Sequence, residues 1–183
     1  MTSFRLDGRV ALVTGAGQGL GASISIAYAK AGASVVLLGR TESYLKDTAD
    51  AIRKAGGEAS LIVCDVTNDE KLRKAVSGLD RLDILVNNAG TNFPEPFIEV
   101  SDNHLDAMLD LNVRACFVAA QAAVQVMLKS ADLAEHGASV VNMSSQMGHV
   151  GSPNRTVYCM TKHAVEGLTK AMAVELADKN IRV

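Results

Sequence analysis

Short apolar runs alternate with longer amphipathic stretches along this chain. Five runs are nearly continuous in apolar character: RVALVTG (9–15), ASVVLLGR (33–40), EASLIVCDV (58–66), LDILVNNAG (82–90) and ASVVNMSS (138–145). Continuous apolar runs of this length are typical of strands buried on both faces of a parallel sheet. The last residues, NIRV (180–183), predict the beginning of a sixth strand.

The stretches between these runs have the apolar spacing that is typical of helices. The predicted helices cover residues 20–31, 41–57, 68–78, 102–129 and 156–177. Gly32 is placed to end the first helix, and Ser101 is a suitable N-cap for the fourth. The alternation predicts one doubly wound α/β domain over residues 1–183, in which a parallel sheet lies between two helical layers and the crossovers are right-handed.

The composition agrees with a globular α/β protein. Hydrophobic residues make up 48% of the 183 residues and charged residues 21%, while aromatic residues are only 4% and Trp is absent, which predicts an aliphatic core. The net charge of −2 indicates neither nucleic acid nor an anionic membrane as a partner. The N-terminal MTSFRLDGRV lacks the apolar region of a secretory signal, and no run reaches the roughly 18 apolar residues of a membrane span.

The three cysteines, Cys64, Cys116 and Cys159, are widely spaced and form no CxxC motif. An odd number of scattered cysteines favours reduced thiols and a cytoplasmic protein. Cys159 and His163 are four residues apart, so they could present two metal ligands on one helix face. No further ligand cluster accompanies them, so helix packing is favoured and no metal site is predicted.

A glycine-rich turn, TGAGQGLG (14–21), follows the first predicted strand directly and opens the first predicted helix. Glycines let the backbone approach a phosphate, and the helix N-terminus offers free N–H groups. A P-loop is excluded because no Gly-Lys-Ser/Thr follows. A G-x-G-x-x-A match at Gly17, Gly19 and Ala22 is weak alone, and a tight turn with close helix packing is the alternative. Its place in the first strand–helix unit favours a dinucleotide.

The end of the second predicted strand bears on the choice of cofactor. An acidic residue about 20 positions beyond the glycines binds the ribose 2′-hydroxyl of NAD in nicotinamide-binding folds. Here the segment reads LLGRTE, with Gly39 and Arg40 instead. A guanidinium attracts a 2′-phosphate, so NADP(H) is favoured. NAD(H) stays possible because Glu42 is close by, and Arg40 could also be a solvated loop residue.

Further motifs follow the glycine turn in a fixed order. They are CDV (64–66), NNAG (87–90), LDLNV (109–113), VVNMSS (140–145) and YCMTK (158–162). With these motifs the chain resembles the classical short-chain dehydrogenase/reductase family, close to 3-oxoacyl reductases and sugar dehydrogenases, which implies a Rossmann fold and a nicotinamide cofactor. The cofactor-binding residues that the resemblance implies are Thr14, Gly15, Gln18, Gly19, Leu20, Gly21, Arg40, Thr41, Asp65, Val66, Asn88, Ala89, Gly90, Tyr158 and Lys162.

The resemblance also implies a catalytic set of Asn112, Ser145, Tyr158 and Lys162. Ser145 is chosen over Ser144 because the family commonly places its serine 13 positions before the tyrosine. Tyr158 is the proton donor and acceptor, and a cation one helical turn away favours its phenolate. By resemblance, Lys162 also binds the nicotinamide ribose, Ser145 holds the substrate oxygen, and Asn112 anchors a proton-relaying water. Taken alone, the Tyr/Lys pair would be an ordinary helix-surface pair.

The loop QMGHVGSPNRTV (146–157) is expected to line the substrate side. His149 or Arg155 is a hypothetical receptor for an anionic substrate group, such as a sugar-acid carboxylate. Loop structure or a subunit contact is the alternative for both residues.

The function implied is hydride transfer between NADP(H) and a carbonyl or secondary alcohol. The alternatives are a nucleotide-binding or regulatory protein without turnover, and an inactive truncated fragment. Candidate substrates are 3-oxoacyl thioesters, sugars and sugar acids, steroids and small ketones. Helices 102–129 and 156–177 are expected to form a homodimer or homotetramer. Family members continue past IRV with a substrate-covering segment and a last strand, so the resemblance implies that this chain is truncated in strand six.

Overall fold

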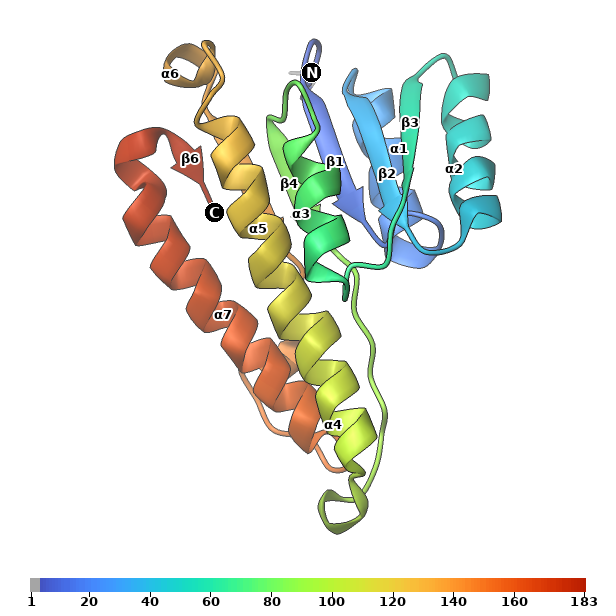
Figure 1. The fold of residues 1–183 in the computed structure, drawn as a ribbon, viewed down its shortest axis with the longest axis vertical. Coiled ribbons are helices and arrows are strands. Elements are labelled where there is room, and N and C mark those ends of the chain that lie inside the picture. Colours follow the sequence, from blue (N-terminus) through green and yellow to red (C-terminus); the bar gives the residue numbers. More distant parts are fainter. Residues whose placement is uncertain (1–3) are drawn as a thin grey trace.

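The computed structural model describes residues 4–183, and its centre is a parallel sheet (Figure 1). The strands within these residues are β1 (Val10–Thr14), β2 (Ser34–Gly39), β3 (Glu58–Val63), β4 (Ile84–Asn87), β5 (Ala138–Asn142) and β6 (Ile181–Arg182). Their order in the sheet is β3-β2-β1-β4-β5-β6, and every neighbouring pair is parallel. The chain runs outward from β1 in one direction and from β4 in the other. This confirms the predicted doubly wound sheet, with its switch point between β1 and β4.

The helices lie between successive strands, as the sequence predicts. They are α1 (Gly19–Lys30), α2 (Glu42–Lys54), α3 (Asp69–Ser77), α4 (Asp102–Leu109), α5 (Ala115–Met127), α6 (Leu133–His136) and α7 (Thr156–Leu176). The apolar pattern does not predict α6, which is a single turn, nor the 3₁₀ turns at Phe97–Glu99, Gln146–Gly148 and Ala177–Lys179. These short turns form in connections, where no periodic apolar face marks them.

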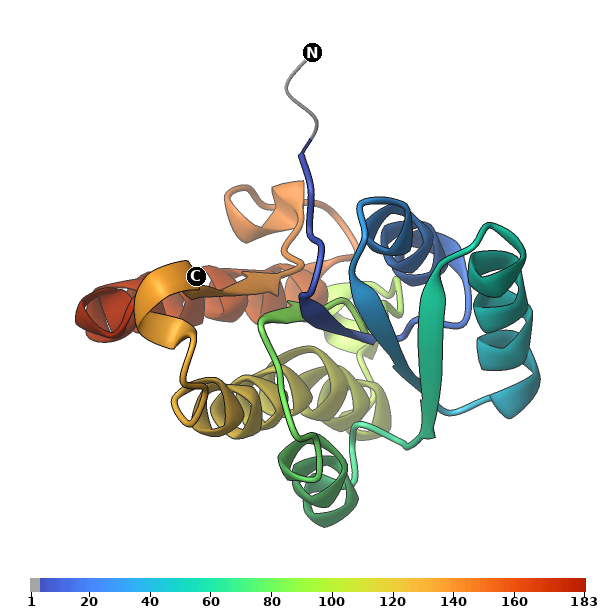
Figure 2. The same cartoon turned by 90° about the horizontal axis from the view of Figure 1, so that it is seen from above.

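Alternate residues of the strands face two separate apolar cores, one on each side of the sheet. Leu12 of β1 packs with residues of α3 and α5, whereas its neighbours Ala11 and Val13 pack with residues of α1 and α2. Figure 2 shows α3 and α5 on the side of the sheet opposite α1. The side chains of both cores are mainly Val, Leu, Ile and Ala, which confirms the three-layer architecture and the aliphatic core.

The helix predicted over residues 102–129 is interrupted. Ser101 caps α4 as predicted, since its hydroxyl accepts a hydrogen bond from the N–H of His104 at 3.2 Å. A π-helical turn at Asp110–Arg114 then separates α4 from α5, and α5 ends at Met127. The π turn contains neither Gly nor Pro, so the sequence gives no clear signal for it. π turns of this kind occur frequently at functional sites.

The segment Asp102–Met127 is long and apolar enough to cross a membrane by length and composition, with a mean hydropathy of 1.3. However, 56% of the 18-residue stretch with this hydropathy is buried inside the protein. Within the segment, α5 packs against α3 and the sheet. It is therefore a core helix of the fold. Figure 1 shows that α4 and the first turns of α7 project beyond the carboxyl ends of the strands.

Candidate active site

A cleft of about 350 Å³ lies at the carboxyl ends of β1, β2 and β4, at the switch point of the sheet. The predicted cofactor residues that line it are Gly15, Gln18, Gly19, Arg40, Thr41, Val66, Asn88, Ala89 and Gly90. Residues that were not among the predicted cofactor contacts also line it, namely Gly17, Gly39, Tyr44, Leu45, Cys64 and Leu111. Of these, Gly17 belongs to the glycine turn and Gly39 precedes Arg40, so adjacency to the motifs was the available signal.

The glycine turn is a cradle that side chains would fill. A Cβ at Gly21 would overlap the carbonyl of Gly15 and the amide of Asn88, and one at Gly17 would lie 2.9 Å from Cβ of Tyr44. Gly15 has a φ of +65°, which favours glycine. Gln18 occupies the N-cap of α1 without a side-chain cap among the described residues, so the first N–H groups of α1 face the cleft uncapped. Free amides and close backbone approach suit the phosphates of a dinucleotide.

Thr14 and Asn88 join β1 to β4 beneath this cradle. The Thr14 hydroxyl accepts hydrogen bonds from the N–H groups of Asn88 at 3.0 Å and Ala89 at 3.1 Å, and the Asn88 side chain donates to the Thr14 carbonyl at 3.0 Å. Thr14 is almost fully buried, and it lines a small cavity behind the cleft. Thr14 and Asn88 therefore fix the shape of the turn from below.

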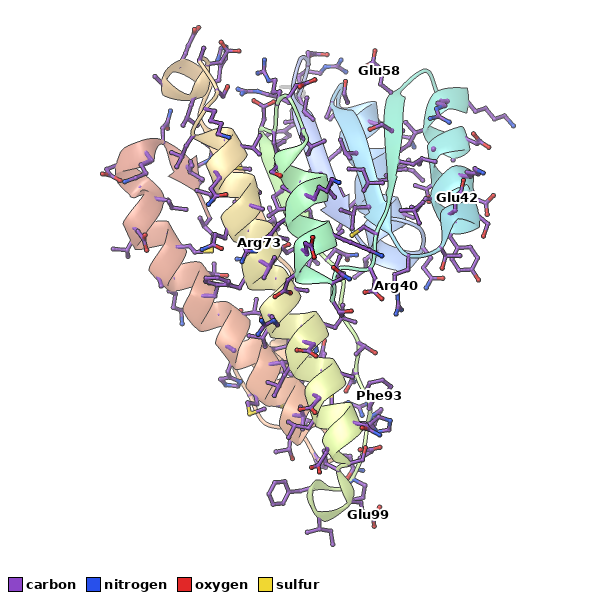
Figure 3. The ribbon with its side chains drawn as sticks, in the orientation of Figure 1. Arg40, Glu42, Glu58, Arg73, Phe93 and Glu99 are labelled. Atoms are coloured by element: carbon purple, nitrogen blue, oxygen red, sulfur yellow. The ribbon has the colours of Figure 1, made fainter. Side chains whose placement is uncertain are left out.

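Arg40 lines the cleft directly after the end of β2 (Figure 3). Its side chain is 70% exposed, and its guanidinium lies 3.9 Å from the carboxylate of Asp65. Asp65 also accepts two hydrogen bonds from Thr67, at 3.0 Å and 2.9 Å, and lines an adjoining hollow together with Arg40 and Lys71. The guanidinium is thus accessible to an anionic group at the end of β2.

Glu42, the acidic residue that competes with this interpretation, is engaged elsewhere. Its carboxylate lies 2.7 Å from the ammonium of Lys46 on the same helix. The hydrogen bond from Lys46 lowers the pKa of Glu42 below its ordinary value. The carboxylate of Glu42 is therefore paired with Lys46, one turn further along α2.

Tyr158 and Lys162 come together on the first turns of α7. The Lys162 side chain is buried, with 7% of the residue exposed, and its Nζ lies 5.6 Å from the centre of the Tyr158 ring. Nζ donates a hydrogen bond to the carbonyl of Met143 at 2.6 Å. Burial lowers the pKa of Lys162, because desolvation disfavours the ammonium form. The ammonium is therefore held at a defined position beside a partly exposed phenol.

Asn112 lies in the π turn and links it by hydrogen bonds to Thr91, in the loop after β4, and to Thr161 on α7. Its amide oxygen accepts from the N–H of Thr91 at 2.8 Å, while its amide nitrogen donates to the Thr91 carbonyl at 2.9 Å and to the Thr161 hydroxyl at 3.2 Å. Thr161 in turn donates to the carbonyl of Tyr158 at 2.8 Å. Sequence reasoning missed Thr91 and Thr161. Thr91 directly follows the NNAG motif, which was the only signal available for it.

Ser145 begins the 3₁₀ turn Gln146–Gly148, which packs against α7. Its hydroxyl accepts a hydrogen bond from the N–H of Met147 at 3.2 Å. This bond fixes the serine side chain and leaves its hydroxyl proton free to be donated. The structure therefore places Ser145 on a segment held against the helix that carries Tyr158.

The two residues predicted for an anionic substrate group have different surroundings. His149 lies with Nε2 at 3.4 Å from the carboxylate of Glu166 on α7, so it faces a negative charge. Arg155 is the N-cap residue of α7, and its carbonyl accepts from the N–H of Cys159 at 2.7 Å. Its guanidinium donates only to the Asn154 carbonyl, at 3.5 Å, among the hydrogen bonds of the described residues. Arg155 thus keeps its donors for a ligand, whereas His149 is paired.

The loop after β4 and the loop before α7 are linked by contacts that the sequence did not indicate. The rings of Phe93 and His104 stack with centroids 4.2 Å apart, and His104 Nδ1 bonds the carboxylate of Glu95. The Glu95 N–H donates to the carbonyl of Asn154 at 3.1 Å, which links the loop after β4 to the loop before α7. Figure 3 shows Phe93 beside α4, beyond the carboxyl ends of the strands.

Comparison with known proteins identifies the family of the chain. The model of the short chain dehydrogenase family matches residues 9–183. An uncharacterized oxidoreductase of Thermotoga maritima is 39% identical over 179 residues, which are 97% of this chain and 69% of the relative. Bovine L-xylulose reductase is 41% identical over 181 residues, covering 98% of this chain and 70% of the relative. A gluconate 5-dehydrogenase from Burkholderia cenocepacia, crystallised with NADP and tartrate, superposes with a TM-score of 0.89 at 33% identity, covering 98% of this chain and 70% of that one.

The chain belongs to the short-chain dehydrogenase/reductase family. It is an NAD(P)-dependent oxidoreductase that acts on alcohol or carbonyl groups, as its relatives do.

Proposed function

We propose that this protein is an NADP(H)-preferring carbonyl reductase or alcohol dehydrogenase, with Tyr158 as the acid and base. The observation that carries the proposal is the buried ammonium of Lys162 beside the Tyr158 ring on α7. Neither residue is among those that line the glycine-rich cleft. A buried cation has a desolvation cost, and such perturbed groups are typical of functional sites. A regulatory nucleotide-binding protein would gain nothing from it.

The cleft residues and the neighbouring Leu20, Gly21 and Asp65 hold the dinucleotide in this proposal. Arg40 receives the 2′-phosphate, since its exposed guanidinium is a charge-assisted donor and Glu42 is paired with Lys46. Similar solved structures that contain NADP support this preference. When bound, the cofactor supplies or accepts the hydride.

The chain's own residues move the proton. Tyr158 gives a proton to the substrate oxygen during reduction and removes it during oxidation. Lys162 holds the ribose and favours the charged phenolate. Ser145 donates a hydrogen bond to the same substrate oxygen. The Asn112 side chain is engaged with Thr91 and Thr161, so we assign the relaying water to a main-chain carbonyl of the π turn.

The proposed substrate is a polyhydroxylated carbonyl compound or sugar acid. L-xylulose reductase and gluconate 5-dehydrogenase are among the similar proteins, and Arg155 is available for a carboxylate at the substrate side. The oligomer would form through helices α4–α5 and α7, on which Phe117, Met160 and Val174 are exposed. The three buried free thiols favour a cytoplasmic location for the single dinucleotide-binding domain.

Absorbance of NADPH at its reduced-nicotinamide band, followed over a panel of ketoses, keto sugar acids, hydroxysteroid ketones and small ketones, tests this function. We expect turnover with NADPH for at least one ketose or sugar acid, and a lower kcat/KM with NADH. Arg155→Ala should reduce kcat/KM for acidic substrates relative to neutral ones. Saturable nucleotide binding without turnover on any member would favour the regulatory alternative.

A further inference from the structure

We infer that Thr169 is a positioning residue for Lys162, acting through a partly buried hydrogen-bond network that attaches α7 to the end of β5. The inference rests on the proposed function, in which Lys162 serves the reacting groups. Thr169 touches neither the cleft nor Tyr158 in any contact of the described residues. Its effect on the reaction would therefore be indirect.

The network begins with Asn142, the last residue of β5. Its amide nitrogen donates to the Thr169 hydroxyl at 3.0 Å. Its amide oxygen accepts from the side-chain nitrogen of Asn87 at 2.9 Å and from the thiol of Cys116 at 3.5 Å. Asn87 and Asn142 lie opposite each other in the β4–β5 pairing, and Asn87 also donates to the Cys116 carbonyl at 3.2 Å. Two strands and α5 therefore fix the orientation of the Asn142 amide.

Burial raises the pKa of the Cys116 thiol to about 11. The thiol therefore stays protonated at neutral pH and keeps its proton for the Asn142 oxygen. With both sides of the Asn142 amide occupied, the amide cannot rotate to serve another partner without leaving buried groups unpaired.

The Thr169 hydroxyl also has both a hydrogen-bond donor and an acceptor as partners. Its hydroxyl accepts from Asn142 and donates to the Val165 carbonyl one turn earlier, at 2.8 Å. Val165 itself is almost completely buried. Lys162, Val165 and Thr169 are spaced at i, i+3 and i+7, so they form one stripe along α7 that faces the sheet.

The two ends of this stripe bind consecutive residues of one segment. Thr169 binds the side chain of Asn142, and Lys162 binds the main-chain carbonyl of Met143. Two attachments on one helix face determine both its rotation and its position along its axis. A slip of a single residue moves a side chain by about 1.5 Å along the axis and about 100° around it. Errors of about 1 Å at reacting groups can lower rates roughly 100-fold.

A second anchor keeps α7 attached when the Thr169 contact is removed. Thr161 receives a hydrogen bond from Asn112 of the π turn, and α7 buries Val157, Cys159 and Leu176. Replacement of Thr169 should therefore leave a folded protein in which the Lys162 ammonium is less precisely held. This separates a positioning role from a role in folding.

The test compares Thr169→Val, which keeps the shape but removes the hydroxyl, with Thr169→Ser, which keeps the hydroxyl. Asp83→Asn is the control for lost stability, because Asp83 lies at the opposite end of β4. We expect Thr169→Val to lower kcat 10- to 100-fold with the KM for NADPH changed less than threefold, and Thr169→Ser to stay within twofold of the wild type. Asp83→Asn should lower Tm without changing kcat.

A second readout does not depend on turnover. In protein labelled with ¹³C-lysine, the pH titration of Lys162, assigned with Lys162→Arg, reports the surroundings of the ammonium, which faces Tyr158 and Cys116. Thr169→Val should move this titration toward the value of a free lysine, and Thr169→Ser should not. A lower Tm with wild-type kcat and an unmoved titration would overturn the inference. Absence of turnover in the wild type would contradict the proposed function, while the titration would still decide the role of Thr169.

Discussion

The glycine-lined cleft, the proposed cofactor site, and the start of α7 are built in opposite ways. The cleft is made mainly of backbone and exposed side chains, such as Gly15 with its positive φ and Arg40, which is 70% exposed. The α7 region is made of buried polar side chains, such as Lys162 and Asn112, each bonded to protein groups. A backbone cradle provides affinity for phosphates without demanding particular side chains, whereas a buried polar network provides position. We therefore expect substitutions in the cleft to change cofactor affinity and substitutions near α7 to change the rate.

Tyr158→Phe should show the largest difference between an effect on the rate and an effect on cofactor binding. It removes the proposed proton donor but keeps the ring near Lys162, so kcat should fall by about 10²- to 10⁴-fold, the usual contribution of general acid–base catalysis. The Kd for NADPH, from fluorescence titration, should stay within twofold. Tyr28→Phe, on the half-buried face of α1, is the matched control and should leave both quantities unchanged. A rise in the Kd for NADPH as large as the fall in kcat would contradict the assignment of affinity to the cleft and of rate to the α7 region.

Gly21→Ala should act on the cleft instead. The added Cβ meets the Gly15 carbonyl and the Asn88 amide, and overpacking of this kind costs about 1–3 kcal/mol. The Kd for NADPH should rise between about 5- and 150-fold. Gly167→Ala is the control, because a Cβ there meets nothing within 4 Å and Ala is the better helix former. If Gly21→Ala binds NADPH like the wild type, the cradle does not hold the phosphates.

Arg40→Asp should alter the choice of cofactor. Loss of a charge-assisted hydrogen bond costs about 1.5–3 kcal/mol, which corresponds to a roughly 10- to 150-fold weaker Kd for NADPH. The Kd for NADH should not weaken, since NADH lacks the 2′-phosphate. Lys54→Asp makes the same change of charge at the far end of α2 and should alter neither Kd. Equal losses for both nucleotides would show that Arg40 does not read the 2′-phosphate.

Asp83→Asn should affect stability alone and have the smallest effect on function. Burial by itself would raise the pKa of Asp83, but hydrogen bonds from Arg81, the Val10 amide and Arg9 hold it below its ordinary value. A carboxyl group of this kind adds stability that is complete above its unfolded-state pKa and is lost as pH falls through its folded-state pKa.

The variant should therefore lower the free energy of unfolding at pH 7 by about 1.5–3 kcal/mol. The difference from the wild type should shrink once the pH falls below about 4. Urea denaturation at pH 7 and at pH 3 measures both values. A difference that is the same at the two pH values would mean that the charge of Asp83 is not what stabilises the fold.

The strands and most helices were predictable because burial on two faces leaves continuous apolar runs, and amphipathic helices leave a periodic pattern. The order of the motifs also indicated the glycine turn, Tyr158 and Lys162 as candidate site residues. The π turn at Asp110–Arg114 and the bonds of Thr161 and Thr169 were not predictable. They depend on which tertiary neighbour meets each hydroxyl or carbonyl, and no local spacing records that.

Glu42 illustrates the same limit within the cleft. In the sequence it lies two residues after Arg40 and competes as an alternative contact of the ribose. In the structure its carboxylate meets Lys46 on the same helix. An i, i+4 pair is visible in the sequence, but only the fold shows which of two possible partners the carboxylate takes.

Binding of a nicotinamide dinucleotide in the glycine-lined cleft is the step on which the proposed roles of both regions depend. The most direct measurement is a fluorescence titration of the wild-type protein with NADPH and NADH side by side, with the number of sites per chain taken from the NADPH curve. We expect one site per chain and a Kd for NADPH at least tenfold lower than that for NADH. Failure of either nucleotide to saturate the protein, or a lower Kd for NADH, would contradict the proposed roles of the cleft and of Arg40.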